Sequence, residues 1–190
     1  MNDVKTRCNW CQSSDKMMAY HDNYWGTPTH GDQELFAKLV LDMNQAGLSW
    51  NTILNKMESF YEAYDDFDIE TVANYDAVKF DELLSNPGII RNKLKVAAAT
   101  NNAQKVLEIQ KEFGSFDAYI WSFTDGKVEQ HEISDESEIP ATNELSDQMS
   151  KDMKKRDFKF TGSTVIYAYL QAIGVINDHA KYCFKYDELK

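Results

Sequence analysis

Apolar side chains recur every three or four residues along most of this chain, and that spacing restricts the fold to one built from helices. Asp32 stands where an N-cap is expected for a helix over residues 32–46, and Gly47 is a suitable helix stop. The chain has only 8 glycines and 3 prolines, too few for the many tight turns of an all-β fold. We therefore predict an all-α fold. The apolar stripe of the first predicted helix consists of Leu35, Phe36, Leu39, Val40 and Met43.

The same periodicity extends through the rest of the chain, with one exception. In residues 125–141, Lys127 is followed by five acidic residues and no Lys or Arg, so we predict a surface loop. No repeat or linker divides the sequence, and residues 1–190 are expected to form a single domain. His30 and His131 lie in polar segments and are predicted to be surface residues. Further helices are predicted at residues 49–64, 68–74, 76–85, 92–112, 115–123, 143–155 and 163–176.

Charge and composition exclude several classes of protein. With 20 Lys and Arg against 31 Asp and Glu, the net charge of −11 argues against a general nucleic-acid coat. A nucleic-acid enzyme needs its positive charge on one face, and two basic clusters exist, although most such runs are solvated helix faces. They comprise Arg91, Lys93 and Lys95, and Lys151, Lys154, Lys155, Arg156 and Lys159.

The sequence also indicates where the protein works. Residues 1–10 lack the apolar core of a signal peptide, and the uncharged run at 160–177 is too polar to span a membrane. An odd number of cysteines, three, does not suit a disulfide scaffold. We expect a cytoplasmic protein with no membrane partner.

Four residues are candidate metal ligands: Cys8, His21, His179 and Cys183. His179 and Cys183 are four residues apart, a spacing that places both side chains on one face of a helix. Two cysteines and two histidines suit a tetrahedral Zn²⁺ that is closed to water and structural, and it would join the two ends of the chain. From spacing alone two alternatives stay open. Cys8 and Cys11 form a C-x-x-C that suits a redox pair or zinc half-site, and all four residues are compatible with an ordinary core.

Large aromatic residues gather in the first fifty positions: Trp10, Tyr20, Trp25 and Trp50. Such residues most often serve the core, but a tryptophan–tyrosine group can also stack on a flat heterocycle. Asp42 lies at the edge of the apolar stripe, where solvation is the simplest interpretation. If it faces the aromatic rings instead, it becomes a carboxylate in an apolar pocket that favours an amino-bearing or cationic ligand.

Two short connections have the form of nucleic-acid contacts. The turn containing Gly47 and Leu48 is either a packing turn or a rigid probe that inserts Leu48 into a DNA stack. The segment from Gly88 to Arg91 and Lys93 separates two predicted helices within residues 76–112. It is compatible with a helix-hairpin-helix, whose backbone N–H groups hold a DNA phosphate.

Together these pieces resemble the 3-methyladenine DNA glycosylase I family. The similarity covers nearly the whole chain, in order, which is far more specific than any one motif. The matching blocks are RCNW at 7–10, YHDNYWG at 20–26, QAGLSWNTIL at 45–54, GIIRNK at 88–93, WSF at 121–123, FKFTG at 158–162 and GVINDH at 174–179.

The resemblance implies a helix-hairpin-helix repair enzyme that excises 3-methyladenine from alkylated double-stranded DNA and releases the free base. It implies one structural Zn²⁺ per chain on the four candidate ligands, with no such role for Cys11. It also implies a base pocket formed by the four aromatic residues with a carboxylate at Asp42, where Tyr20, Asp42 and Trp50 carry the chemistry. Gly47, Leu48, Gly88, Arg91 and Lys93 would contact DNA.

Two positions depart from the family pattern. The family usually has glutamate where this chain has Asp42, and the shorter side chain reaches roughly 1.3 Å less far, a misplacement that can cost about 10²-fold in rate. Met17 also stands where relatives often have an aromatic residue.

The expected reaction is monofunctional hydrolysis of the N-glycosidic bond of a flipped nucleotide, by a monomer. A lyase would need a lysine directly after the hairpin, where this chain has Asn92, with Lys93 one residue away. The zinc deaminase pattern is absent from the sequence. The alternative from a different class is a zinc-stapled module that binds modified bases with little or no cleavage.

Overall fold

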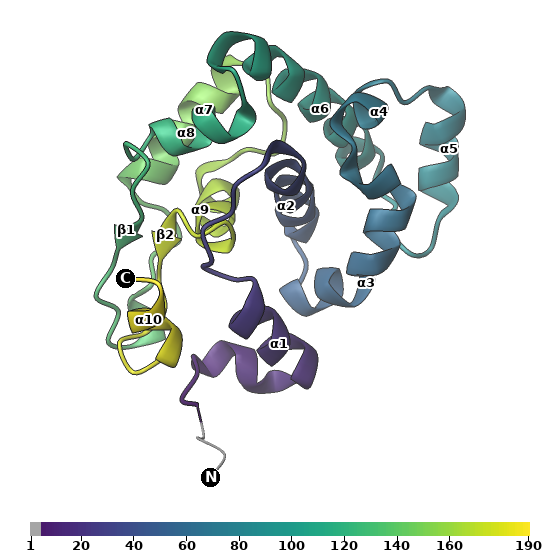
Figure 1. The fold of residues 1–190 in the computed structure, drawn as a ribbon. Helices are drawn as coiled ribbons and strands as arrows, with labels where there is room; N and C mark the ends of the chain where they lie inside the picture. The colour runs from purple at the N-terminus through teal and green to yellow at the C-terminus, as the bar shows by residue number, and fades with distance from the viewer. Residues whose placement is uncertain (1–4) are drawn as a thin grey trace.

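The structure is a computed structural model, and it describes residues 5–190. Helices make up most of this part of the chain, as the periodicity predicts (Figure 1). Two-residue strands β1 (Glu129–Gln130) and β2 (Ile176–Asn177) pair in parallel. The helices are η1 (Asn9–Ser13), α1 (Asp15–Asn23), α2 (Asp32–Gln45), α3 (Trp50–Ala63), η2 (Asp65–Phe67), α4 (Ile69–Ala73), α5 (Ala77–Ser85), α6 (Lys93–Phe113), α7 (Phe116–Ser122), η3 (Glu136–Glu138), α8 (Glu144–Lys155), α9 (Ser163–Ala172) and α10 (Phe184–Glu188).

Helix α2 lies in the middle of the fold, in contact with α3, α6, α7 and α9 (Figure 1). The predicted apolar stripe is fully buried, and burial extends to residues beside it because neighbouring helices cover more than one side of α2. Asp42 is among these additional buried residues, so the simple interpretation of a solvated side chain is wrong.

Local caps explain where several helices begin. The Ser49 hydroxyl accepts a hydrogen bond from the Thr52 backbone N–H, and Asn92 accepts from the N–H groups of Leu94 and Lys95. Gly47 has a φ of +79°, which lets the chain turn sharply between α2 and α3. These caps place Trp50 at the first residue of α3.

Asp32 has a different role from the predicted one. The N-cap of α2 is Gly31, and Asp32 belongs to the first helical turn. Its carboxylate instead accepts hydrogen bonds from the N–H groups of Phe116 and Asp117, each at 2.9 Å, at the start of α7. The acid therefore joins the beginnings of two helices, where both helix dipoles favour negative charge.

Residues 125–141 are more ordered than a plain surface loop, since they contain β1 and η3. His131 is correspondingly half-buried and not a simple surface residue, because its ring hydrogen-bonds to Asp178 at 2.6 Å and to Glu129 at 2.7 Å. The hydrogen bond to Asp178 raises the pKa of His131 to about 9. His30, in contrast, has a side chain that is 61% exposed, as predicted.

The last predicted helix ends early. Helix α9 stops at Ala172 because Gly174 adopts a φ of +73°, and a Cβ there would lie 2.4 Å from the backbone of Thr27 and Pro28. The chain then forms β2 and a turn, so His179 and Cys183 do not lie on one helix face as the spacing suggested. The turn nevertheless brings the two side chains together.

Two members of the basic clusters are bound to other groups of the protein. Lys95 is buried, and its ammonium group donates to the carbonyls of Asn44 and Ala46, both at 2.8 Å, which fixes α6 against the end of α2. Arg156 forms ion pairs with Glu112 and Asp152. No helix of the described residues is long and apolar enough to cross a membrane.

Candidate base pocket and metal centre

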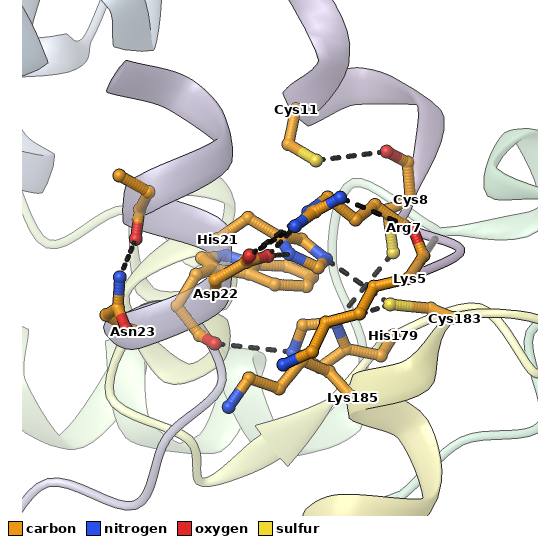
Figure 2. A network of polar contacts seen from close by, with 12 residues as sticks. Lys5, Arg7, Cys8, Cys11, His21, Asp22, Asn23, His179, Cys183 and Lys185 are labelled. Carbon is orange, nitrogen blue, oxygen red and sulfur yellow. Dashed lines mark hydrogen bonds and ion pairs between the residues drawn. The ribbon is translucent and has the colours of Figure 1, made fainter. Parts of the chain in front are cut away.

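The four predicted metal ligands converge at one buried point between the two ends of the described chain (Figure 2). Their donor atoms all lie within 4.8 Å of one another. Cys183 Sγ is 3.4 Å from His21 Nε2 and 3.7 Å from His179 Nδ1, and Cys8 Sγ is 3.8 Å from His179 Nδ1. Tetrahedral Zn²⁺ with ordinary Zn–S and Zn–N bonds requires sulfur–nitrogen separations of about 3.6 Å. The donor set and its spacing therefore fit zinc.

The charges at this centre also suit a cation. A hydrogen bond from the Cys8 thiol lowers the pKa of Cys183 well below its ordinary value, and the same hydrogen bond, together with burial, raises the pKa of Cys8. One thiolate is thus already favoured, and a divalent ion would favour the second as well. Cys11 is outside the cluster: its thiol donates to the Cys8 carbonyl at 3.1 Å, and burial raises its pKa to about 11. A redox pair of Cys8 and Cys11 has no support in this arrangement.

A second layer of contacts orients the two histidines. His21 Nδ1 lies 2.9 Å from Asp22 Oδ1, which turns its Nε2 toward Cys183 (Figure 2). Burial opposes ionisation of Asp22, but hydrogen bonds from Arg7 and His21 lower its pKa below the usual value. The hydrogen bonds from Arg7 to Asp22, and between Asp22 and His21, thus hold this candidate ligand in place.

Close to these candidate ligands is a cavity of about 380 Å³. Its lining includes all five predicted pocket residues, namely Trp10, Tyr20, Trp25, Asp42 and Trp50. The elements η1, α1, α2 and α3 supply four of them, and Trp25 lies two residues after the end of α1. The sequence predicted this set, whereas it did not indicate two further lining residues, Gln171 and Glu136.

The rings form walls at stacking distance from one another. Trp10 and Trp25 meet edge-on, with centroids 5.0 Å apart at 71°, and Tyr20 and Trp50 have centroids 5.0 Å apart at 41°. Trp25 and His179 also meet edge-on at 4.6 Å, so the pocket wall rests directly on a predicted metal ligand. The cluster of candidate ligands is therefore in direct contact with the aromatic wall.

Asp42 is a buried carboxyl without a partner. It is 5% exposed, and neither its Oδ2 nor the nearby Trp50 Nε1 has a hydrogen-bond partner in the described structure. Burial raises the pKa of Asp42 to about 8, although the charge of Lys38 opposes the rise. Because buried polar atoms are normally paired, an acceptor and a donor left free in one cavity indicate a binding site.

Lys38 is the cation nearest in the sequence to that carboxyl, one helical turn earlier. Its ammonium group donates to Thr29 Oγ1 at 2.9 Å and to the Ala172 carbonyl at 3.2 Å. Burial lowers the pKa of Lys38. A second, larger cavity of about 870 Å³ contains Lys38 and shares Asp42 and Trp50 with the first. The sequence did not single out Lys38, because a lysine within a helix carries no pattern.

The predicted DNA-contacting residues lie on or near the surface. Gly47, Arg91 and Lys93 are exposed, and Leu48 is 42% exposed despite its apolar side chain. Gly88 packs so closely on α3 that a Cβ there would be 2.9 Å from the Ser59 Cβ. The turn between α5 and α6 is therefore firmly seated, with its cationic residues free to face outward.

Comparison with known proteins agrees with this arrangement. A family model described as methyladenine glycosylase matches residues 10–186. The DNA-3-methyladenine glycosylase of Haemophilus influenzae is 39% identical over 180 residues, covering 95% of this chain and 97% of the relative. DNA-3-methyladenine glycosylase 1 of Escherichia coli is 37% identical over 180 residues, covering 95% and 96%.

Solved structures give the same result. A crystal structure of 3-methyladenine DNA glycosylase I superimposes with a TM-score of 0.91 at 38% identity, covering 94% of this chain and 98% of the other. A structure of the Staphylococcus aureus enzyme that addresses its recognition of 3-methyladenine superimposes with a TM-score of 0.90 at 35% identity, covering 94% of this chain and 95% of the other. The chain belongs to the methyladenine glycosylase family.

Proposed function

We propose that this chain is a base-excision repair glycosylase that hydrolyses the N-glycosidic bond of 3-methyladenine in alkylated double-stranded DNA. The observation that carries the proposal is the aromatic cavity with one buried, unpartnered carboxyl, Asp42. A purine is flat and matches stacking walls, and its amino group matches a free acceptor. Relatives in the same family include a tyrosine-to-phenylalanine variant solved in complex with 3-methyladenine.

In this proposal each pocket residue has a defined task. Tyr20 and Trp50 stack on the extruded base, while Trp10 and Trp25 close the remaining wall. Asp42 Oδ2 accepts a hydrogen bond from the exocyclic amine of the base, either directly or through a water that makes up for the short side chain. Entry of the base then satisfies a buried atom that is unpartnered in the free protein.

The chemistry needs little more than stabilisation of the leaving group. The 3-methylated nucleotide is cationic, so its glycosidic bond is already weakened, and flipping costs only a few kcal/mol for a damaged base. The pocket stabilises the departing base, and water attacks C1′ of an oxocarbenium-like sugar.

A monofunctional reaction suits the residues after the hairpin. At the position where a lyase carries its lysine, Asn92 instead caps α6. Lys93 is about 100° further around the helix. Lys95 is committed to two backbone carbonyls, so it is not a free nucleophile.

DNA binding is assigned to the exposed turns. We place a helix-hairpin-helix in α5 and α6 within residues 76–112, with Gly88, Arg91 and Lys93 toward the phosphates. Leu48, with Gly47 beside it, acts as the wedge that fills the space left by the flipped base. A single domain over residues 1–190, acting as a monomer in the cytoplasm, is consistent with this assignment.

Cys8, His21, His179 and Cys183 would hold one structural Zn²⁺. Such an ion would link the N-terminal and C-terminal segments rigidly, a structural role. The 4.6 Å contact between Trp25 and His179 then transmits that rigidity to the base pocket. Asp22 and Arg7 keep His21 oriented toward Cys183.

The second candidate is a module that binds modified bases with weak or no cleavage, and it is favoured by the short Asp42. A base-release assay separates the two. Methylated duplex DNA is incubated with the protein, and free 3-methyladenine and 7-methylguanine are quantified. If the protein is a glycosylase, it releases 3-methyladenine, and this release falls in the variants Trp50→Ala and Asp42→Asn. Tight binding of methylated DNA without release of either base would instead support the module.

A further inference from the structure

Glu136 belongs to the acid-rich segment that the sequence indicated only as a surface loop, yet it lines the base cavity. It is the first residue of η3, and its side chain turns back toward the N-terminal segment. Its carboxylate accepts hydrogen bonds from the backbone N–H groups of Asn9 and Trp10, the latter at 3.1 Å. The Tyr182 hydroxyl donates to the same group at 2.7 Å.

The segment that carries Glu136 is itself held in place. Asp135 accepts hydrogen bonds from Ser137, and Glu138 accepts from the Ser134 N–H at 2.9 Å, so the short helix is capped at its start. The position of Glu136 is therefore fixed from two sides: by the cap within its own segment and by donors from both ends of the chain.

The three donors to Glu136 are all neutral. Among the described residues, no lysine or arginine lies within ion-pair distance of it. Neutral N–H and O–H groups fix a carboxylate without cancelling its charge. The base cavity thus has one acidic group in its buried wall, Asp42, and a second at its side, Glu136.

We propose that Glu136 is a specificity-determining residue that makes the pocket prefer cationic bases over neutral bases of the same shape. The proposal rests on the assignment of this cavity as the base pocket. Asp42, buried and with its pKa raised to about 8, is mostly neutral near pH 7 before a base enters. The half-buried Glu136 then supplies the negative charge at the cavity that attracts a cationic N-alkylpurine before it binds.

The expected effect is moderate, because Glu136 is partly solvated. A charge–charge interaction of about 1.4 kcal/mol, the order expected between part-exposed groups, corresponds to about tenfold in binding or in kcat/KM. Removing the charge should therefore cost about tenfold for a cationic base and little for a neutral one.

The test compares Glu136→Gln with the wild-type protein on two probes. One is methylated duplex DNA, in which 3-methyladenine is cationic, with release of the free base as the readout. The other is duplex DNA containing 3-deaza-3-methyladenine, a neutral isostere, with the dissociation constant as the readout. Glu132→Gln is the matched control, since Glu132 lies in the same loop with a side chain that is 79% exposed.

We expect Glu136→Gln to lose about tenfold in kcat/KM on methylated DNA and less than twofold in affinity for the neutral isostere. Glu136→Asp, which keeps the charge, should retain most of the preference, and Glu132→Gln should match the wild type. Equal losses on both probes would show that Glu136 only positions Trp10, and no loss on either would show no role. Either result overturns the inference.

Trp50→Ala separates this inference from the proposed function. If Trp50→Ala abolishes release while Glu136→Gln equals the wild type, the base pocket stands and only the role of Glu136 fails. If Trp50→Ala leaves release unchanged, the assignment of the pocket fails, and with it the basis of this inference.

Discussion

Replacing Asp42 by asparagine should weaken function and should stabilise the protein increasingly as the pH rises, because the unfolded chain ionises Asp42 while the folded protein keeps it protonated. The pKa of Asp42 is raised to about 8 in the folded state, against about 3.9 in an unfolded chain. Between these values the folded protein binds a proton at Asp42 that the unfolded chain has released. Stability therefore falls as the pH rises from about 4 to about 8, by up to about 1.4 kcal/mol per pH unit.

The magnitude follows from that interval. Between pH 5 and pH 7 the wild type should lose about 2.5 kcal/mol relative to Asp42→Asn, which cannot ionise. The asparagine amide introduces a new buried donor that costs about 1–3 kcal/mol, but this cost is the same at both pH values. The pH dependence of the difference is therefore a cleaner quantity than the difference at a single pH.

Urea unfolding of both proteins at pH 5, 6 and 7 measures the effect. The free energy of unfolding of the variant minus that of the wild type should increase steadily with pH. If the difference in free energy of unfolding stays constant across this range, Asp42 titrates normally. The inference that its carboxyl is buried and neutral in the free protein would then be wrong. A control at the exposed Glu132, changed to glutamine, should show no such trend.

Three further outcomes are expected. Elemental analysis should find about one zinc per chain. A strong chelator, or the substitution Cys183→Ser, should lower the melting temperature markedly. Zinc-free protein of unchanged stability would contradict the metal assignment. Gly26→Ala should destabilise the protein more than Gly114→Ala does. Both glycines have a positive φ, but of the two only Gly26 would place a Cβ against another residue, 2.6 Å from His179 Nε2. Equal melting temperatures of the two variants would argue against that close contact. Asp42→Glu should raise kcat/KM for base release, by about tenfold if the extra reach restores a direct contact, and a loss of activity would show that the pocket is built around the shorter side chain.

The sequence predicted the helices and the aromatic set well, because both depend on local spacing or on blocks in register. Ser49 and Asn92 begin α3 and α6 through local caps, which short-range patterns reveal. The end of α9 was misplaced because Gly174 is required by packing against Thr27 and Pro28, residues that are distant in the sequence.

The site was less accessible to sequence reasoning wherever it depends on long-range contacts. Cys8 and His179 are separated by most of the chain, so only the family resemblance could connect them. Glu136 is one acid among many in its segment, and nothing in its spacing indicates a side chain that turns toward Trp10. Asp42 could be placed on α2, but its burial depends on helices that cover α2 from other parts of the chain.

The central claim is that a purine occupies the cavity that Tyr20 and Trp50 line, with Asp42 at its amino edge. A crystal structure of this protein soaked with free 3-methyladenine tests it most directly. The account predicts the base stacked in the cavity of about 380 Å³, with its exocyclic amine within hydrogen-bond reach of Asp42 Oδ2 or of a water bound there. A base bound elsewhere, with this cavity filled by protein side chains, would contradict it.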